Sequence, residues 1–405
     1  MQAFKNHMTA GVSVFFSVWT ITFLYTHIMQ PIGLSEHHWF STVCLLCGMG
    51  CIFSALFIKQ PYVIAPGISI GLFASHLITH PSQNINLFIA IMCVGAILIL
   101  ISNIPTIKKT KEIIPPHLQE AINIGIGLLF IRIAVEQQFT SIANNWNIST
   151  LLFFLSIFSL LFFRMRQNRW GIFITVFICI VISLITHHTH WAGLFARPTG
   201  LMILPQLSSP PHYFEIFKNT VELSLFAIFD SAAGYFCLHQ LQQSLHHDVP
   251  PRLPQTYFTV GLNNLLSGFF LCGPNTVYIE GSVGIQLGAK NYQSTLVVAS
   301  CFALFLFCFP LGHLIPGELF KGILAFIGLS LLGGIYHLRK KTNYEIWSTL
   351  LIILIICVRK SILDGLIVGI IMTWIHQHFN KIDTQPLLKW GGALGVFTFA
   401  LRYLV

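Results

Sequence analysis

Two acidic residues lie inside apolar segments, where few other charged groups occur. Asp230 stands midway in LFAIFDSAAGYF and Glu280 in GPNTVYIEGSVG, and only 13 of the 405 residues are acidic. An ionised carboxylate at the centre of a membrane helix costs roughly 2.5–3.5 kcal/mol, so acids at that depth are usually functional. A buried carboxyl group can hydrogen-bond a polar solute or bind and release a proton. We expect Asp230 and Glu280 to face one cavity, where they bind the solute and exchange a proton. Glu280 is the first candidate for contact with the solute. A neutral, hydrogen-bonded structural role is the alternative.

Two apolar segments are interrupted by proline and glycine. One contains Glu280, and the other is its counterpart in the first half of the chain. Residues 61–78 read PYVIAPGISIGLFASHLI, with Pro66 and Gly67 inside the run, and residues 272–289 read CGPNTVYIEGSVGIQLGA, with Pro274 before it. Unwound backbone is tolerated at membrane depth only where protein or a cavity covers it. We therefore expect two short half-helices that meet back to back, with their positively polarised N-termini aimed at the bilayer centre. Helix–helix packing on small residues is the alternative.

Aromatic residues near the breaks are candidates for stacking on a flat solute. Phe73, Tyr278 and Trp19 are in such positions. Because the chain contains 36 phenylalanines, packing or lipid contact is the alternative for any one aromatic side chain.

The composition is that of an integral membrane protein. Hydrophobic residues make up 55% of the chain and charged residues 9%, whereas about 25% of residues are charged in soluble domains. The mean hydropathy is +0.75. Apolar runs recur along the whole chain, and helices are the elements that cross about 30 Å of hydrocarbon with every backbone group satisfied. The runs cover residues 8–28, 40–58, 65–79, 85–103, 117–135, 149–163 and 170–186, then 219–240, 254–271, 276–289, 295–313, 317–336, 343–357 and 361–378.

The second seven runs repeat the first seven at a shift of about 211 residues, which indicates an internal repeat. An odd number of spans in each half turns the second half over in the membrane, as in many secondary transporters. We expect residues 1–212 to form the first seven-helix repeat and residues 213–385 the second, inverted one. The remaining tail, 386–405, is predicted to be an interfacial helix.

The loop charges support this plan. Of the 22 basic residues, 16 fall in segments that the plan places in the cytoplasm, five fall outside, and Arg132 lies within a span. Lys and Arg are enriched in cytoplasmic loops, so we expect a protein of the cytoplasmic (inner) membrane with both termini in the cytoplasm. Contacts between these residues and anionic lipid explain the basic pI without a nucleic-acid partner. Arg132 precedes Glu136 by four residues, which favours an ordinary helical ion pair.

Neither the cysteines nor the histidines predict a metal site. Cys44 and Cys47 form a C-x-x-C pair inside an apolar span, without the second pair that a metal site needs. His187, His188 and His190 fall in a loop that the plan places outside the membrane. We expect no metal and no cofactor.

Four segments together resemble the xanthine/uracil permease (nucleobase:cation symporter) family, and within it the guanine/hypoxanthine permease branch. They are TAGVSVFFSVWTITFLYTHIM at 9–29, the Ala-Pro-Gly segment at 61–78, LFAIFDSAAGYF at 225–236 and GPNTVYIEGSVGIQLGAK at 273–290. The agreement in order and spacing spans nearly the whole chain. The resemblance implies an all-α membrane protein of about 14 transmembrane helices in two inverted seven-helix repeats. It also implies a core domain of helices 1–4 and 8–11, a gate domain of helices 5–7 and 12–14, and a homodimer.

The resemblance also implies which residues contact the solute. The carboxylates of the family's tenth and eighth helices fall on Glu280 and Asp230, and Thr276 belongs to the same tenth-helix motif. Two positions depart from the branch: Gly71 stands where an asparagine is usual, and Ser231 where a threonine is usual. We take Glu280, Asp230, Thr276 and Gly71 as substrate-binding candidates, together with the aromatic residues Phe73 and Tyr278.

The leading hypothesis is a secondary active transporter, not an enzyme, that moves a nucleobase by proton symport with alternating access. A purine is favoured, and the expected partners are the base, protons and membrane lipid. A second hypothesis keeps the fold but makes the solute another small molecule or an anion, although two acids at the site would repel an anion. A third is a membrane-embedded enzyme, which would need clustered histidine or acid ligands at the membrane face.

Overall fold

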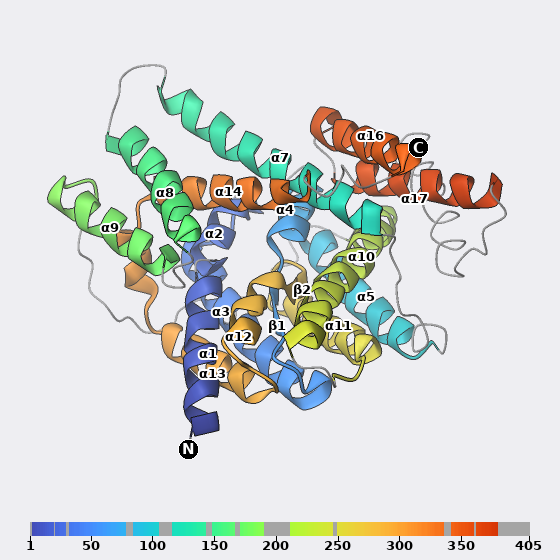
Figure 1. Ribbon diagram of the computed structural model, residues 1–405, viewed down its shortest axis with the longest axis horizontal. Helices are drawn as coiled ribbons and strands as arrows, with labels where there is room; N and C mark the ends of the chain where they lie inside the picture. The colour runs from blue at the N-terminus through green and yellow to red at the C-terminus, as the bar shows by residue number, and fades with distance from the viewer. Residues whose placement is uncertain are drawn as a thin grey trace. The chain divides into compact units, whose positions relative to one another are not determined.

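The computed structural model describes residues 2–19, 21–29, 32–77, 84–104, 116–142, 148–166, 171–189, 211–245, 249–335, 342–359 and 362–379 (Figure 1). Every predicted apolar run has a counterpart among the described elements. Those of the first half are α1 (Gln2–Val18), α2 (Ile21–Ile28), α3 (Glu36–Phe53) with a π-helical end (Ser54–Ile58), β1 (Val63–Pro66), α4 (Ile68–His76), α5 (Asn84–Ser102), α7 (Pro116–Ile142), α8 (Ile148–Met165) and α9 (Gly171–Ile185). The tail predicted as an interfacial helix, 386–405, lies outside the described residues.

The second half has the same order of elements. It comprises α10 (Tyr213–Leu245), α11 (Leu253–Phe269), β2 (Asn275–Tyr278), a 3-10 turn (Ile279–Gly281), α12 (Ser282–Gln286), α13 (Gln293–Phe305), 3-10 turns at Phe309–Leu314 and Leu332–Gly334, α14 (Gly317–Leu331), α16 (Asn343–Arg359) and α17 (Ile362–Phe379). The short, broken third member of each half begins as a strand and continues as a short helix. The structure thus confirms the predicted spans and refines the two broken ones.

The chain divides into two compact units, and each unit combines parts of both sequence halves. The first contains Met1–Lys109, Ile172–Ile174 and Thr189–Ile315, and the second Thr110–Gly171, Thr175–His188 and Pro316–Val405. Apart from the three residues of α9, the first unit holds predicted spans 1–4 and 8–11, and the second holds spans 5–7 and 12–14. This is the division into core and gate domains that the family resemblance implies.

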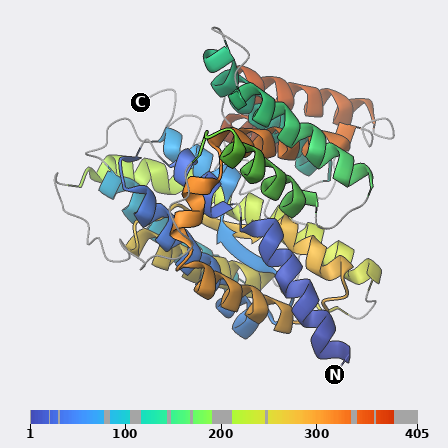
Figure 2. The ribbon, with the colours of Figure 1, turned by 90° about the vertical axis from the view of Figure 1, so that its left-hand side faces the viewer.

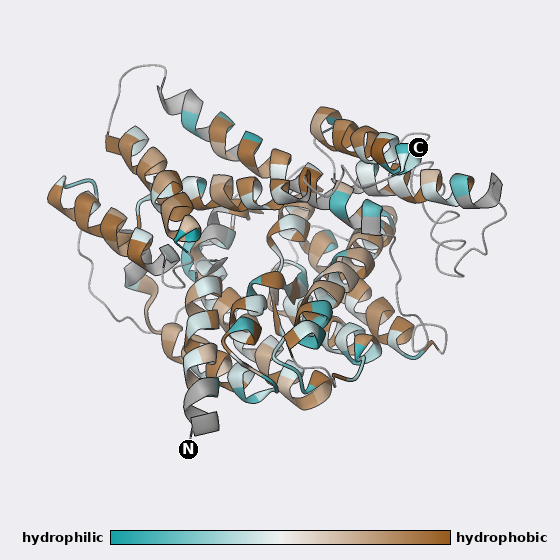
Figure 3. Ribbon diagram, in the orientation of Figure 1, coloured by the Kyte–Doolittle hydropathy of each residue, from teal (hydrophilic) through white to brown (hydrophobic). Residues whose placement is uncertain are grey.

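The helices have the apolar surface of membrane spans. Four described helical segments are long and apolar enough to cross a membrane, judged by length and composition: Glu36–Ile58, Ile85–Ser102, Ile148–Met165 and Tyr213–Leu245. Hydrophobic residues colour most of α8, α9 and α14 in Figure 3. Large side chains such as Phe158 and Leu304 are 66% and 72% exposed, which costs little against lipid but would be unfavourable in water.

In the first unit, helices enclose a two-stranded antiparallel sheet formed by β1 and β2 (Figure 1, Figure 2). α10 packs on β2, α3 packs on β1, and α5 packs along α11. At the α5–α11 crossing, a Cβ atom on Gly95 would come within 2.6 Å of the Gly261 carbonyl oxygen. These glycines therefore allow the two backbones to approach closely.

In the second unit, α7 packs against α14, α16 and α17. A Cβ atom on Gly127 of α7 would lie 2.7 Å from the Gly328 carbonyl oxygen of α14, and one on Gly328 would lie 2.6 Å from that of Gly127. α7 and α14 occupy equivalent places in the two repeats. A contact between equivalent positions is what an internal two-fold relation produces.

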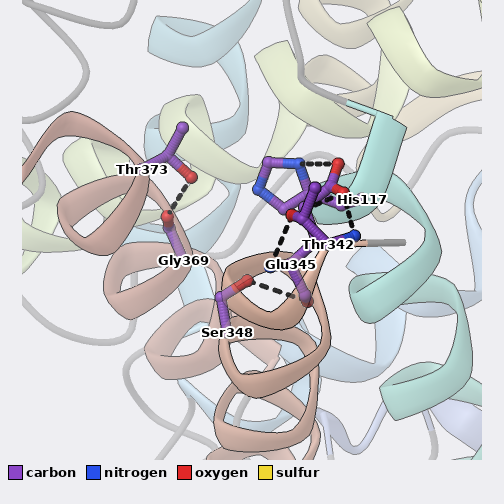
Figure 4. A network of polar contacts seen from close by, with 6 residues as sticks. All are labelled: His117, Thr342, Glu345, Ser348, Gly369 and Thr373. Carbon is purple, nitrogen blue, oxygen red and sulfur yellow. Dashed lines mark hydrogen bonds and ion pairs between the residues drawn. The ribbon is translucent and has the colours of Figure 1, made fainter. Parts of the chain in front are cut away.

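A capping box fixes the start of α16 (Figure 4). The Thr342 N–H donates to Glu345 Oε2 at 2.9 Å, and the Glu345 N–H donates to the Thr342 hydroxyl oxygen at 3.4 Å. His117 of α7 places its Nδ1 atom 3.6 Å from Glu345 Oε1. These contacts satisfy the first backbone groups of α16 and connect that end of the helix to α7.

Candidate functional site

The centre of the first unit is the point where the two broken segments cross. β1 and β2 pair with Val63 opposite Tyr278 and Pro66 opposite Asn275. The Gly67 N–H donates to the Pro274 carbonyl at 3.0 Å, and the Tyr278 hydroxyl donates to the Pro66 carbonyl at 3.1 Å. Segments separated by more than two hundred residues thus satisfy one another's backbone groups, as unwound chain at membrane depth requires.

Side chains of α11 complete the hydrogen bonding of β2. Asn264 accepts the Asn275 N–H at 2.7 Å and donates to the Asn275 carbonyl at 3.2 Å. Its neighbour Asn263 donates to Asn275 Oδ1 at 3.1 Å and to the Leu46 carbonyl at 3.2 Å. All three asparagines are fully buried. The Asn264 amide therefore does for β2 what a neighbouring strand would do.

Each strand leads directly into a half-helix whose N-terminus is at the crossing. α4 follows Gly67, which has an extended backbone and makes no side-chain cap. The 3-10 turn that leads into α12 follows Tyr278, which also makes no side-chain cap. Uncapped N–H groups and the positive end of the helix dipole favour electron-rich groups at such positions. The two half-helices predicted from the proline and glycine breaks are present.

Asp230 reaches this crossing from the middle of α10. The side chains of Thr276 on β2 and Ser69 on α4 lie close to its carboxyl group, and its Oδ2 atom is enclosed without a hydrogen-bond partner. Ser231, the next residue on α10, lies with its hydroxyl oxygen 3.5 Å from that of Thr276. Asp230 of α10 thus lies beside both broken segments, and its Oδ2 atom can still accept a hydrogen bond.

Glu280 lies two residues after the end of β2, in the 3-10 turn before α12. Its side chain is half-buried, and its carboxyl group interacts electrostatically with that of Asp230. The Tyr278 phenol lies within electrostatic range of both carboxyl groups. Two acids and a phenol from α10, β2 and the 3-10 turn therefore lie in one region of the first unit. That the two acids face one cavity stays a prediction.

The remaining candidates divide between two faces of α4. Phe73 is 5% exposed and stacks on Phe226 of α10, with ring centroids 5.6 Å apart. Gly71 is turned toward α2, where a Cβ atom would come within 2.7 Å of the Tyr25 ring. Gly71 therefore makes room for Tyr25, and Phe73 lies on the face that meets α10. Trp19, at the turn between α1 and α2, has its ring contacts elsewhere, for example with Phe305 at 5.6 Å.

Several residues of the site are not predicted from the sequence. Ser69, Asn264 and Phe226 have no motif of their own. A buried amide pair in an apolar span, Asn263 and Asn264, is the signal that could have identified the support of β2, because such amides are costly without partners. Ser69 could have been found from its position four residues before Phe73 on one helical face.

Arg132 and Glu136 form an ion pair away from the crossing. Arg132 Nε lies 2.7 Å from Glu136 Oε1, which confirms the predicted i,i+4 pair. Within the described ranges, no group of three or more His, Cys, Asp or Glu side chains is arranged to hold a metal ion.

An inverted-repeat core with two broken half-helices and paired acids at their crossing defines a class of integral membrane transporter. The chain belongs to the permease family of the xanthine/uracil type, whose model matches residues 5–358. It is similar to the guanine/hypoxanthine permease PbuO of Bacillus subtilis, with 24% identity over 395 residues that cover 91% of this chain and 90% of that protein. It is also similar to the adenine permease AdeP of Escherichia coli, with 22% identity over 91% of this chain and 86% of that protein. These relatives are permeases, and the chain is a transporter rather than an enzyme.

Solved structures share the fold. The transmembrane domain of the cyanobacterial bicarbonate transporter BicA matches with a TM-score of 0.67 and 15% identity, over 90% of this chain and 97% of that one. The murine anion transporter Slc26a9 in its inward-facing state matches with a TM-score of 0.69 and 13% identity, over 93% of this chain and 68% of that one. Likeness at this identity concerns the architecture of two inverted seven-helix repeats and carries no information on the solute.

Proposed function

We propose that this permease carries a nucleobase, with a purine favoured, by proton symport and alternating access. The observation that carries the proposal is the meeting of Asp230 and Glu280 at the crossing of the two half-helices. A nucleobase presents ring N–H donors and carbonyl or ring-nitrogen acceptors on a flat edge. Carboxylates accept from its donors, and the Thr276 hydroxyl and the uncapped N–H groups can serve its acceptors. The Tyr278 hydroxyl, which donates to the Pro66 carbonyl, can accept a further hydrogen bond. The guanine/hypoxanthine and adenine permeases among the relatives support the choice of a purine.

Proton coupling follows from the proximity of the two acids. Two carboxylates that face each other in a poorly hydrated site repel when both are ionised, so one proton between them stabilises the site. A solute that hydrogen-bonds Glu280 changes the balance of charge felt by Asp230, and the proton and the base then bind together. Movement of the unit that contains both acids would carry the proton and the base across the membrane in one step.

Orientation and assembly are part of the proposal. The excess of Lys and Arg in alternate loops supports a protein of the cytoplasmic membrane with both termini in the cytoplasm. The family resemblance supports a homodimer.

The decisive experiment is uptake of labelled hypoxanthine, guanine, adenine, xanthine and uracil into proteoliposomes, with and without an inward proton gradient. We expect gradient-driven uptake of at least one base. Glu280→Gln keeps the shape but loses the charge, so uptake of that base should fall by about a hundredfold, as expected for the loss of a charge-assisted hydrogen bond of 1.5–3 kcal/mol together with coupling. Glu136→Gln, which changes an exposed acid paired with Arg132, is the matched control and should transport normally.

Uptake that survives in Glu280→Gln would remove this residue from the mechanism. Folded protein that takes up no base but accumulates bicarbonate or sulfate would favour the anion alternative over the nucleobase assignment.

A further inference from the structure

A second phenylalanine supports Phe73 at the crossing. Phe226 of α10 and Phe73 of α4 lie with their rings 5.6 Å apart and 13° from parallel. Phe226 is 2% exposed and Phe73 5%. An offset, nearly parallel pair is a favourable arrangement of two aromatic rings.

The pair lies one helical turn from Asp230. Phe226 precedes Asp230 by four residues on α10, and Phe73 follows Ser69 by four residues on α4, so each pair shares a helical face. Because α4 packs against α10 and Ser69 lies close to Asp230, the two helices face each other through two successive layers. One layer is polar, with Asp230 and Ser69, and the next is aromatic, with Phe226 and Phe73. A solute that hydrogen-bonds Asp230 therefore has the aromatic layer as its neighbouring wall.

The opposite face of α4 is also fixed. Tyr25 fills the space beside Gly71, where a Cβ atom would lie 2.8 Å from the phenol oxygen. Tyr25 is fully buried. Contacts on both faces restrict rotation of α4, so the orientation of the Phe73 ring depends on its own side-chain angles and on the ring packed against it.

We propose that Phe226 is a positioning residue that holds the Phe73 ring in one plane, ready to stack on a planar heteroaromatic solute bound at Asp230 and Glu280. The inference rests on the proposed function and adds to it a residue that positions the stacking ring. A ring held in its bound orientation loses less conformational entropy when the solute arrives, which strengthens binding without a new contact. A solute with a saturated, puckered ring would gain little from this arrangement.

The test is a double-mutant cycle on the KM of the base that the wild-type protein transports. Phe226→Leu and Phe73→Leu should each raise KM roughly threefold to tenfold, the range expected for loss of one aromatic stacking contact, and leave the maximal rate nearly unchanged. The double variant should raise KM no more than the larger single effect, because the two rings act as one unit. Dihydrouracil should inhibit base uptake by the wild-type protein less than uracil does. The two compounds should inhibit uptake by Phe226→Leu equally.

Phe302→Leu is the matched control. Phe302 is also fully buried and meets Phe15 edge-on with ring centroids 5.0 Å apart, but it belongs to α13. It should lower thermal stability and leave KM unchanged.

Three outcomes would overturn the inference while the proposed function stands: base uptake with an unchanged KM in folded Phe226→Leu, independent additive effects of the two substitutions, or the same KM increase in Phe302→Leu. A wild-type protein that takes up no base would overturn both.

Discussion

The two acids at the crossing have different surroundings, and this suggests different tasks. Asp230 lies beside the hydroxyl groups of Thr276 and Ser69 and has one enclosed oxygen without a partner. Glu280 stands at the start of a half-helix, and both acidic residues are half-buried. A carboxyl group enclosed at membrane depth is suited to bind and release a proton as access to it changes, whereas one at a helix start is suited to meet a solute. We therefore expect Asp230 to act chiefly in coupling and Glu280 chiefly in recognition.

Asp230→Asn tests this division. The amide keeps the shape and the contacts with hydroxyl groups but cannot ionise, so accumulation driven by a proton gradient should fall at least about tenfold, the effect of 1.4 kcal/mol. Exchange of internal for external base, which needs no net proton movement, should persist. The wild-type rate should rise as the external pH is lowered, because more protons are available for symport, and the rate of Asp230→Asn should not. Both are measured in proteoliposomes, and an unchanged response to pH in the variant would contradict the assignment.

At the scale of elements, the crossing depends on side chains that replace missing backbone partners. Prolines and glycines interrupt the helices at Pro66 and Pro274, and the freed backbone pairs as β1 and β2. β2 would still lack partners on its far side without Asn264 of α11, which binds both backbone groups of Asn275. Asn264 thus maintains the geometry at which both half-helices point to the site.

Asn264→Ala should therefore destabilise the first unit. It leaves a buried N–H and a buried carbonyl of Asn275 without partners, at a cost of about 1–3 kcal/mol for each group. We expect a lower thermal unfolding temperature and a weaker affinity for the transported base, measured on purified protein in detergent.

Thr342→Ala provides the comparison for that experiment. It removes the capping box of α16, which should cost about 1 kcal/mol of stability, and it should leave the affinity for the base unchanged. Stability equal to wild type in Asn264→Ala would show that water or another side chain satisfies β2.

At the scale of the whole molecule, the two sequence repeats and the two compact units are different divisions of one chain. Each unit draws on both halves, so the repeats interleave rather than fold side by side. Both acids, both half-helices and the strand pair belong to the first unit. The site can therefore move as one body, which is the requirement for alternating access by a carrier unit.

The proposed orientation is testable with single cysteines in a protein whose ten cysteines have been replaced. Lys59 is exposed where the π-helical end of α3 stops, and Tyr213 is 81% exposed at the start of α10. A membrane-impermeant thiol reagent should label Tyr213→Cys in right-side-out vesicles and Lys59→Cys in inside-out vesicles, because the charge distribution places the two positions on opposite sides. The reverse pattern would place the termini outside.

Local chemistry is enough to predict much of this protein. The length of apolar runs, the cost of a carboxylate in hydrocarbon and the effect of proline on a helix are properties of short segments, so the spans, Asp230, Glu280 and the two breaks can be read from the sequence. The distribution of charge predicts an orientation by the same kind of reasoning. Only the tertiary structure decides which side chains share the crossing. It pairs Val63 with Tyr278 and places Asn264 against the backbone of Asn275. It also turns Gly71 toward Tyr25 and packs Phe226 against Phe73. Each of these joins segments far apart in the chain, where steric fit and the need to satisfy buried polar groups act only once the helices have packed.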